Sequence, residues 1–483
     1  MNEPHPPLDT TAATAAVATR GRPLGLWRIV FLVVSAAAPL TGMLGAVPAA
    51  ISLGNGAGIP GAFVIAGVVL LMFSVGFAAM SRHVVRAGAF YAYISAGLGR
   101  PAGMGGAFVA LLSYTCIQIA LYGLFGFFGT VVIGPALHTS MPWYGYAFAC
   151  AAIVQTTGSR GIDLNSRLLG VLVGAELGIL LLLSIAIVVH GGGPDGLTLA
   201  PLEPRRVFSG HAGIAVMFAF ASFIGFEATA IYGNECRHPT VTVPRATYLS
   251  VALILAFFAF VTWAIVCAYG LERVADVAAK EPGDFWFIQS DRYLGRALTT
   301  AMSVLLLTSI FASLLSFHHT IVRYIRALSA EGILPAALKR LHPEYGSPYR
   351  AGWLQTASVC VPLGLFIAAG SDPFTVVFSW GSALGTIGVV MLLAATSFSV
   401  AAFFRATKQD TRVWHTLVAP LAGGLGLLWI GALLVANLDA LSGSGGPVVR
   451  ALPWGVAAAA LAGIALGVVL RRTRPDVYAR FGH

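Results

Sequence analysis

The chain has 483 residues, of which 57% are hydrophobic and 10% are charged, and its mean hydropathy is +0.83. Soluble domains carry about a quarter of charged residues, so this composition excludes a soluble enzyme or sensor domain and indicates a protein embedded in the lipid bilayer. The net charge of +10 would suit a nucleic-acid partner only if it formed a soluble basic face. Because the basic residues fall in loops between apolar blocks, we expect no nucleic-acid partner.

Residues 1–24 are rich in Ala, Thr and Pro and lack apolar periodicity, so we expect a disordered tail there. The apolar block that follows is longer than the core of a signal peptide, and more blocks come after it. We therefore expect this block to span the membrane.

Twelve apolar blocks follow the tail, each near the 20 residues that a spanning helix needs. The third and tenth are long, which predicts a tilt or a break, and the fourth is short. Their approximate limits are 29–53, 59–81, 102–133, 142–158, 168–190, 210–235, 246–270, 297–322, 350–370, 373–404, 414–437 and 451–470. The predicted fold class is an all-α polytopic membrane protein with twelve transmembrane helices.

The basic residues predict the orientation of these spans. With the N-terminus inside, 22 of the 29 Lys and Arg residues fall in cytoplasmic segments and 7 in outside segments. The positive-inside rule therefore predicts that both termini are cytoplasmic, with residues 472–483 as a second tail.

Two spans carry helix-weakening residues near their middle. Pro39 in the first span removes a backbone donor, and Gly42 weakens the helix after it. In the sixth span, Gly225 precedes Glu227, a carboxylate in an otherwise uncharged apolar segment. A proline kink and a helix-packing glycine would explain each feature singly. An interrupted helix beside a charge is also how membrane transporters form a substrate site.

The spacing of the two interruptions favours the transporter hypothesis. Spans one and six are five crossings apart, and because five is odd, a repeat of five spans re-enters the bilayer with inverted orientation. Matching interruptions in two inverted halves indicate a transporter site. We expect one repeat over 25–208, an inverted repeat over 209–412, and two further helices over 413–471.

Three blocks of sequence have a recognisable pattern. The first comprises residues 88–93 (GAFYAY) and 97–101 (GLGRP); the second comprises 225–227 (GFE), 235–239 (ECRHP) and 243–246 (VPRA); the third runs from Arg323 through 332–335 (GILP) to Pro348. In this order, and with twelve spans, they resemble signatures of the amino acid–polyamine–organocation transporter superfamily, in its bacterial amino acid permease branch.

The resemblance implies two inverted five-helix repeats, with helices 1 and 6 broken, in a bacterial cytoplasmic membrane. It also implies that the substrate carboxylate meets amides of the first broken helix and the ammonium meets carbonyls at both breaks. Helix ends suit these charges. The predicted substrate-binding residues at the breaks are Ala38, Leu40, Thr41, Gly42, Phe223, Gly225, Phe226 and Glu227.

Two positions depart from the family pattern. Thr41-Gly42-Met43 stands where the family often has three small residues, so Met43 either narrows the site or points away. His318-His319 stands where the family often has Asn, and we interpret this pair as a structural replacement, although a His pair there would also be able to titrate.

Other polar residues inside spans have two explanations each. Glu176 in span five either couples proton movement to transport, as Glu227 also would, or bonds a neighbouring helix in its protonated form. Tyr114, Gln118 and Tyr122 share one helix face, which either lines the pathway, so that Tyr114 and Gln118 join the candidate site, or forms a packed seam. The serines of span eight, Ser309, Ser313 and Ser316, either hold Na⁺ or, as we favour, pack helices.

The favoured function is a secondary transporter that moves an amino acid by alternating access, coupled to protons or by exchange. A polyamine or other organic amine is the alternative substrate, and a small-solute channel is a more distant alternative. The chain lacks hydrolase and P-loop motifs, so we expect neither an enzyme nor a primary pump. Its five cysteines lack metal-ligand spacing, and we expect no metal and no cofactor.

Overall fold

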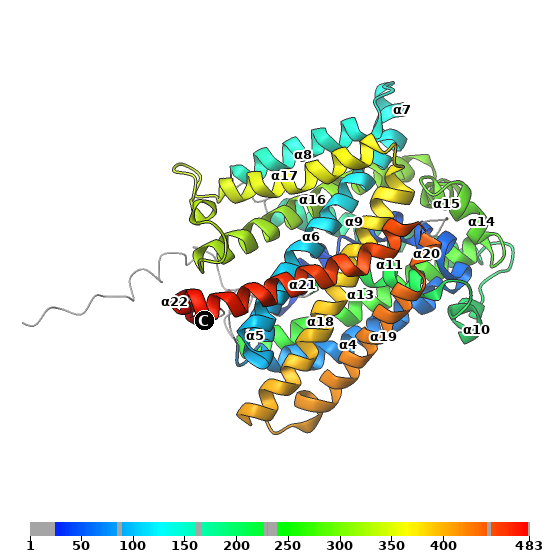
Figure 1. The fold of residues 1–483 in the computed structure, drawn as a ribbon. Coiled ribbons are helices and arrows are strands. Elements are labelled where there is room, and N and C mark those ends of the chain that lie inside the picture. The colour runs from blue at the N-terminus through cyan, green and yellow to red at the C-terminus, as the bar shows by residue number, and fades with distance from the viewer. Residues whose placement is uncertain are drawn as a thin grey trace, which may run out of the picture.

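The computed structural model describes residues 25–84, 89–160, 166–226, 229, 239–441 and 446–481. Regular structure in these ranges is helical, apart from one isolated bridge between Gly193 and Gly196 (Figure 1). The main helices of the first half are α1 Leu26–Ala36, α2 Pro39–Thr41, α3 Val47–Ala50, α4 Ile59–Met80, α5 Ala89–Leu98, α6 Arg100–Phe128, α7 Gly134–Leu137, α8 Trp143–Ser159 and α9 Ser166–Val189. Wider π-helical turns at Gly42–Ala46 and Ile51–Asn55 flank α3, and another at Gly129–Ile133 follows α6.

The second half has the same character. Its helices are α10 Pro204–Val207, α11 Ala212–Ala221, α13 Pro239–Tyr269, α14 Val274–Lys280, α15 Phe285–Leu294, α16 Arg296–Ala330, α17 Tyr349–Ala368, α18 Ser379–Thr407, α19 Ala419–Ala436, α20 Leu438–Leu441, α21 Pro447–Thr473 and α22 Pro475–Arg480. π-Helical turns Pro373–Phe378 and Trp414–Val418 lead directly into α18 and α19.

Nine helical stretches in the described ranges are long and apolar enough to cross a membrane. They are Pro39–Met80, Arg100–Leu137, Gly170–Val189, Thr240–Tyr269, Arg296–Ala330, Tyr349–Ala368, Pro373–Thr407, Trp414–Ala436 and Pro447–Thr473. The predicted twelve spans exceed this number for three physical reasons. The part of span one after its break runs on into span two; α8 has only 17 residues; and α11, in span six, has only 10 residues before its break. An all-helical membrane protein is thus confirmed, while the number twelve stays a prediction.

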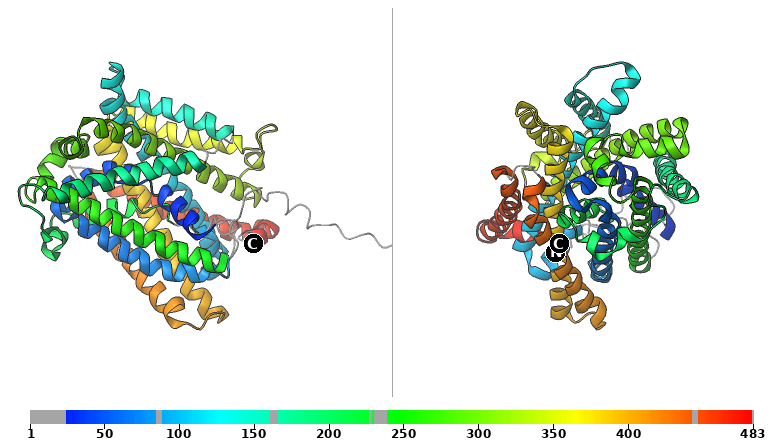
Figure 2. Two further views of the ribbon diagram at one scale, coloured as in Figure 1. Left: turned by 180° about the vertical axis from the view of Figure 1, so that it is seen from behind. Right: turned by 90° about the vertical axis from the view of Figure 1, so that its right-hand side faces the viewer.

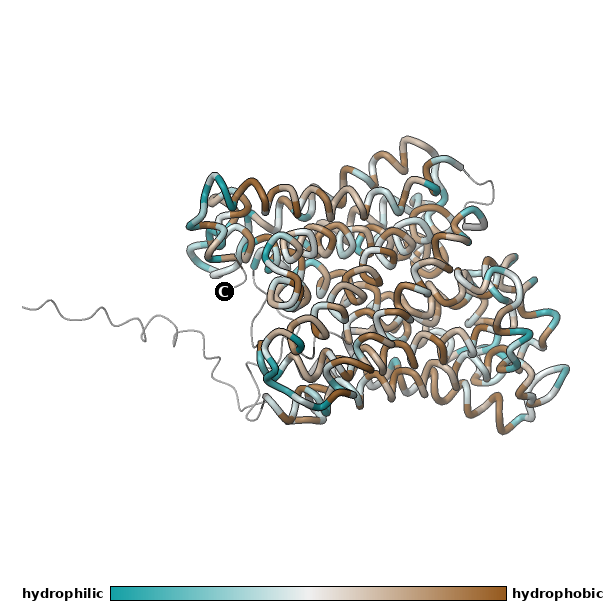
Figure 3. The backbone as a smooth tube through the Cα atoms, turned by 60° about the horizontal axis from the view of Figure 1, so that its bottom comes forward, coloured by the Kyte–Doolittle hydropathy of each residue, from teal (hydrophilic) through white to brown (hydrophobic). Residues whose placement is uncertain are grey.

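The helices lie side by side and their loops gather at two ends. The middle of the bundle is coloured hydrophobic and hydrophilic segments cluster toward the ends (Figure 3). The α16–α17 loop and α22 lie at one end, and α7, α10, α14 and α15 lie at the other (Figures 1 and 2). This separation is what a bilayer requires, because apolar surface belongs at its core and charged loops belong in water.

The C-terminal helix α22 is held against the start of α6. The Arg100 guanidinium donates hydrogen bonds to the carbonyls of Ala479 (3.0 Å) and Phe481 (3.3 Å). Phe481 is fully buried, and its ring stacks on Tyr91 with centroids 5.4 Å apart. The GLGRP block at residues 97–101 therefore has a structural role, since its arginine satisfies carbonyls at the end of the chain.

Glycines bring α6 and α21 into close backbone contact. A Cβ added to Gly463 would lie 2.5 Å from the Met104 carbonyl oxygen, and one added to Gly467 would lie 2.9 Å from the Cα of Pro101. Small residues allow helices in a membrane to approach closely and gain van der Waals contact, because the hydrophobic effect gives little drive there.

We predict that Gly463→Leu destabilises the protein, since no side chain fits between these backbones without moving a helix. Overpacking typically costs about 1–3 kcal/mol, and the melting temperature in detergent should fall accordingly. Gly364→Leu in α17 is the matched control, because a Cβ there meets no atom within 4 Å. An equal fall in both variants would contradict the close-packing account.

Candidate functional site

The first break in the helical chain lies at Ala37 and Ala38. Helix α1 ends at Ala36, and Ala38 has a left-handed backbone (φ 43°, ψ 70°), an uncommon conformation for a residue with a side chain. Pro39 disfavours the helical conformation in the residue before it and then begins α2 at the position where proline fits best. The break therefore lies directly before Pro39, the residue that predicted an interruption of span one, and precedes the Thr41–Gly42–Met43 triplet.

The second break follows α11. Residues 222–226 form turns in place of helix, and Gly225 has φ 116°, a conformation that only glycine adopts without strain. Glu227, the carboxylate predicted beside this break, lies outside the described residues. The interruption of span six at Gly225 is thus present as predicted, whereas the position of Glu227 is not described.

The two breaks contact each other. A Cβ added to Gly42 would lie 3.3 Å from both the Cβ and the Oγ of Ser222. Because residue 42 is a glycine, the backbone after α2 can contact the backbone after α11. Both breaks therefore border the same space.

Glu176 on α9 joins the first break to α16. Its Oε2 accepts hydrogen bonds from the Leu40 amide at 3.4 Å and from the Ser309 hydroxyl at 2.8 Å, and Thr41 donates to Ser309 at 2.9 Å. The Glu176 side chain is buried, and within the described part of the chain it forms no ion pair. Helix α2 begins with a proline, so Leu40 carries its first amide, and a negative carboxylate is favoured at this positive helix end.

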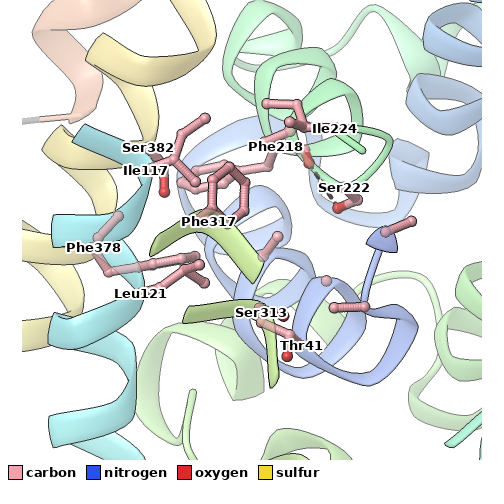
Figure 4. A pocket seen from close by; sticks show the side chains of 16 residues that line it. Thr41, Ile117, Leu121, Phe218, Ser222, Ile224, Ser313, Phe317, Phe378 and Ser382 are labelled. Atoms are coloured by element: carbon pink, nitrogen blue, oxygen red, sulfur yellow. Dashed lines mark hydrogen bonds between the residues drawn. The ribbon is translucent and has the colours of Figure 1, made fainter. Parts of the chain in front are cut away.

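A small cavity of about 70 Å³ lies beside the breaks (Figure 4). Helices α1, α2, α6, α11, α16 and α18 and their flanking turns contribute to its wall. The lining residues are Ala37, Ala38, Thr41, Gly42, Ala46, Ile117, Ala120, Leu121, Phe218, Ala221, Ser222, Ile224, Ser313, Phe317, Phe378 and Ser382.

The wall of this cavity is mostly apolar. Its side-chain polar groups are four hydroxyls, those of Thr41, Ser222, Ser313 and Ser382, and no charged side chain belongs to the described lining. Phe218 and Phe378 stack with their centroids 5.9 Å apart, and Phe317 stands among them in Figure 4. The cavity therefore suits a ligand with an apolar body whose charges are met by backbone groups.

The structure brings together only part of the predicted site. Ala38, Thr41 and Gly42 line the cavity, whereas Leu40 contacts Glu176 through its amide. Met43 is buried away from the cavity, and its carbonyl accepts a hydrogen bond from Trp286 at 2.9 Å.

Phe223, Gly225 and Phe226 do not line the cavity. The Phe223 ring packs against Phe63 and Phe258, and the Phe226 ring packs against Phe73. Gly225 shapes the turn without lining the cavity.

On α6, the ring of Tyr114 lies 5.9 Å from that of Phe317. The amide of Gln118 donates to the Leu314 carbonyl at 3.3 Å and accepts from Gln355 at 2.6 Å. Both residues pack against neighbouring helices, and Tyr114 contacts Phe317 of the cavity wall. A role of either residue in binding stays a prediction.

Sequence reasoning missed most of the apolar wall. Ile117 and Leu121 lie on the α6 face adjacent to Gln118, and Phe218 and Phe378 look like ordinary core residues in the sequence. The one available signal was position, because Phe218 and Ser222 are four residues apart and share the helix face that leads to the second break.

Comparisons with known proteins agree with this architecture. Residues 24–470 match the amino acid permease family. The chain is 24% identical to the branched-chain amino acid permease of Bacillus subtilis, over 92% of this chain and 93% of that protein. It is 22% identical to the methylthioribose transporter of the same organism, over 88% and 90% of the two chains. It is also 23% identical to the low-affinity putrescine importer of Escherichia coli K12, over 77% and 80%.

The family match covers nearly the whole chain, and the relatives are bacterial multi-pass membrane proteins. The chain therefore belongs to the amino acid permease family of the amino acid–polyamine–organocation superfamily, and it is a membrane transporter and not an enzyme.

Proposed function

We propose that this permease carries an amino acid with an uncharged, apolar side chain across the bacterial cytoplasmic membrane by alternating access. The observation that carries the proposal is the cavity between two helix breaks, with apolar walls and four hydroxyls. The proposal includes the inverted repeats over 25–208 and 209–412, the two helices over 413–471, and cytoplasmic termini.

The helix ends at the cavity suit the charged groups of an amino acid. The Leu40 amide bonds Glu176, so the next amide at this end of α2, that of Thr41, is the one we assign to the substrate, since amides at a helix start attract a carboxylate. The end of α11 at Ala221 presents carbonyl groups, whose partial negative charge attracts an ammonium. A zwitterion placed between these two ends has each charge opposite the complementary dipole.

The wall of the cavity favours an apolar side chain on that zwitterion. Ile117, Leu121, Phe218, Phe317 and Phe378 offer contact area, and burial of apolar surface stabilises a complex by roughly 25 cal/mol per Å². The similarity to a branched-chain amino acid permease supports the same substrate class.

A polyamine is the second candidate, because a putrescine importer is among the relatives. Putrescine carries two ammonium groups, and burying an unpaired charge is costly. Since the described lining holds no carboxylate, the second ammonium would need an acid from outside that lining, and Glu227, which follows Phe226 in the sequence, is our candidate for it.

Glu176 is our candidate for the coupling residue. A proton on this carboxylate changes its bonds to the Leu40 amide and the Ser309 hydroxyl, and both partners adjoin the first break. Protonation would therefore alter the hydrogen bonds that join α9 to α2 and to α16. Exchange without net proton movement is the alternative form of coupling.

Binding is the most direct prediction of the proposed function. Purified protein should gain thermal stability with leucine, isoleucine, valine or methionine, and less with putrescine, because a ligand that binds the folded state raises its stability. Gly42→Leu should weaken binding of the best amino acid by at least about 100-fold, equal to about 2.7 kcal/mol, since the side chain enters the cavity.

The control is Gly174→Leu on α9, where a Cβ meets nothing within 4 Å. Both variants should remain monodisperse in size-exclusion chromatography. Normal amino acid binding by folded Gly42→Leu protein would place the substrate elsewhere, and stronger binding of putrescine than of any amino acid would favour the second candidate.

The coupling hypothesis predicts a separation of two activities. In proteoliposomes, a pH gradient without sodium should drive uptake by the wild type, and Glu176→Gln should abolish this response while exchange continues. Glutamine keeps an oxygen that can accept the hydrogen bond from the Leu40 amide, so the fold should persist. Glu281→Gln, at an exposed position, should behave as wild type. A strict sodium requirement in the wild type would refute proton coupling.

The orientation is tested by labelling. Ala279→Cys and Ala406→Cys place a thiol at exposed positions on the two sides of the predicted topology. In intact cells and a background without other cysteines, an impermeant maleimide should label the thiol at position 279 and not the one at position 406. The reverse pattern would show that the orientation is inverted.

A further inference from the structure

A second cavity, of about 210 Å³, lies near the end of α16 that carries the α16–α17 loop. Helix α8 contributes Ser159 to it, α16 contributes His318, Arg323 and Arg326, and the loop and α17 complete the wall. None of its lining residues lines the cavity at the helix breaks. It is therefore a separate space that the transport proposal does not use.

Two guanidinium groups give this second cavity its charge. Arg323 and Arg326 are three residues apart on α16, so they lie on the same side of the helix. Neither forms an ion pair with any residue in the described ranges, and the described lining holds no carboxylate. Glu344 is in the same loop but does not line the cavity.

The wall opposite the arginines is a structured loop. The Ser347 hydroxyl donates a hydrogen bond to the Ser159 carbonyl, which ties the loop to the end of α8. Nδ1 of His342 accepts from the amides of Glu344 and Tyr345 at 3.3 and 3.4 Å, and its ring stacks on Tyr345 with centroids 4.7 Å apart. These contacts hold the Tyr345 side of the cavity in place without a ligand.

The remaining groups extend the polar character of the wall. The hydroxyl of Tyr349 accepts a hydrogen bond from Arg350 at 3.0 Å, so a third guanidinium contacts a residue of the wall. His318 and His319 have ring centroids 6.1 Å apart and both line the cavity. Hydroxyl and imidazole groups add hydrogen-bonding capacity around the two arginines.

We propose that this second cavity binds a ligand carrying an anionic phosphate group, with Arg323 and Arg326 as its charge partners. Guanidinium groups match phosphate oxygens in pairs of parallel hydrogen bonds. Arg323 and Arg326 are exposed and have no ion-pair partner in the described ranges, so they leave positive charge at one cavity that an anion neutralises. The phosphate belongs either to an anionic lipid headgroup at the membrane surface or to a soluble phosphate compound.

The test measures thermal unfolding of the purified full-length protein with two probes. Inorganic phosphate is compared with chloride at equal ionic strength, and phosphatidylglycerol is compared with phosphatidylcholine in mixed micelles. At least one anionic phosphate probe should stabilise the wild type. Stabilisation by phosphatidylglycerol alone identifies a lipid ligand, and stabilisation by inorganic phosphate as well identifies a soluble one.

Charge removal at the cavity is compared with charge removal nearby. Arg323→Gln/Arg326→Gln should weaken the affinity for the stabilising probe at least about tenfold. Arg471→Gln/Arg472→Gln removes the same charge from exposed positions at the end of α21 and should keep the wild-type affinity. Equal loss in the two double variants, or no stabilisation of the wild type by either probe, would overturn the proposal.

If the glutamine double variant does not fold, the affinity for the stabilising probe is measured with Arg323→Lys/Arg326→Lys instead. Lysine keeps both charges but loses the planar pair of donors, so the affinity should still fall. An unchanged affinity in this variant would contradict guanidinium recognition of phosphate. Amino acid binding at the helix breaks should be the same in every one of these variants, which separates this proposal from the proposed transport function.

Discussion

A helix that is broken inside a bilayer must find partners for the backbone groups that it frees, because lipid offers none. At the first break, that partner is Glu176, whose carboxylate accepts hydrogen bonds from the Leu40 amide and the Ser309 hydroxyl. At the second break, i to i+3 bonds such as that from the Phe223 amide to the Phe220 carbonyl keep the turn satisfied. The space between the breaks exists because both helices are interrupted there, and these hydrogen bonds stabilise the interruptions.

The same constraint explains why small residues concentrate around the breaks. Gly42 faces Ser222, and Ala37 and Ala38 stand at the end of α1. Larger side chains would fill the space that the broken backbone opens. The bulky groups of the cavity, Phe218, Phe317 and Phe378, come from different elements and form its apolar wall.

Sequence patterns predicted the helices well because spanning helices need long apolar blocks, and loops between them carry charge. Pro39 indicated the first break because proline disfavours the helical conformation in the residue before it. Gly225 indicated the second break because glycine adopts positive φ angles that an α-helix does not contain. The register of the first break was less predictable, since the effect of Pro39 falls on the preceding Ala38.

The cavity wall was beyond such patterns. In an apolar span, a residue that lines a cavity and one that packs in the core have the same chemistry, so Ile117 and Phe378 carried no signal. Only the packing of α6 against α16 and α18 decides that Ile117 lines the cavity while Gln118 bonds Leu314 and Gln355.

Helix α16 connects the three features of this protein. Ser309 bonds Glu176, Ser313 and Phe317 line the cavity at the breaks, and Arg323 and Arg326 line the second cavity. The central claim, however, is that substrate occupies the space between the breaks.

Protection of a cysteine at Ser382 tests that claim most directly. Ser382 lines the cavity, and a thiol is close in size to its hydroxyl, so the Ser382→Cys protein should fold and react with a small maleimide. The account predicts that the amino acid that stabilises the protein best slows this reaction, while a thiol at the exposed position Ser209 reacts at the same rate with or without it. An unchanged rate at Ser382→Cys with saturating amino acid would contradict the account.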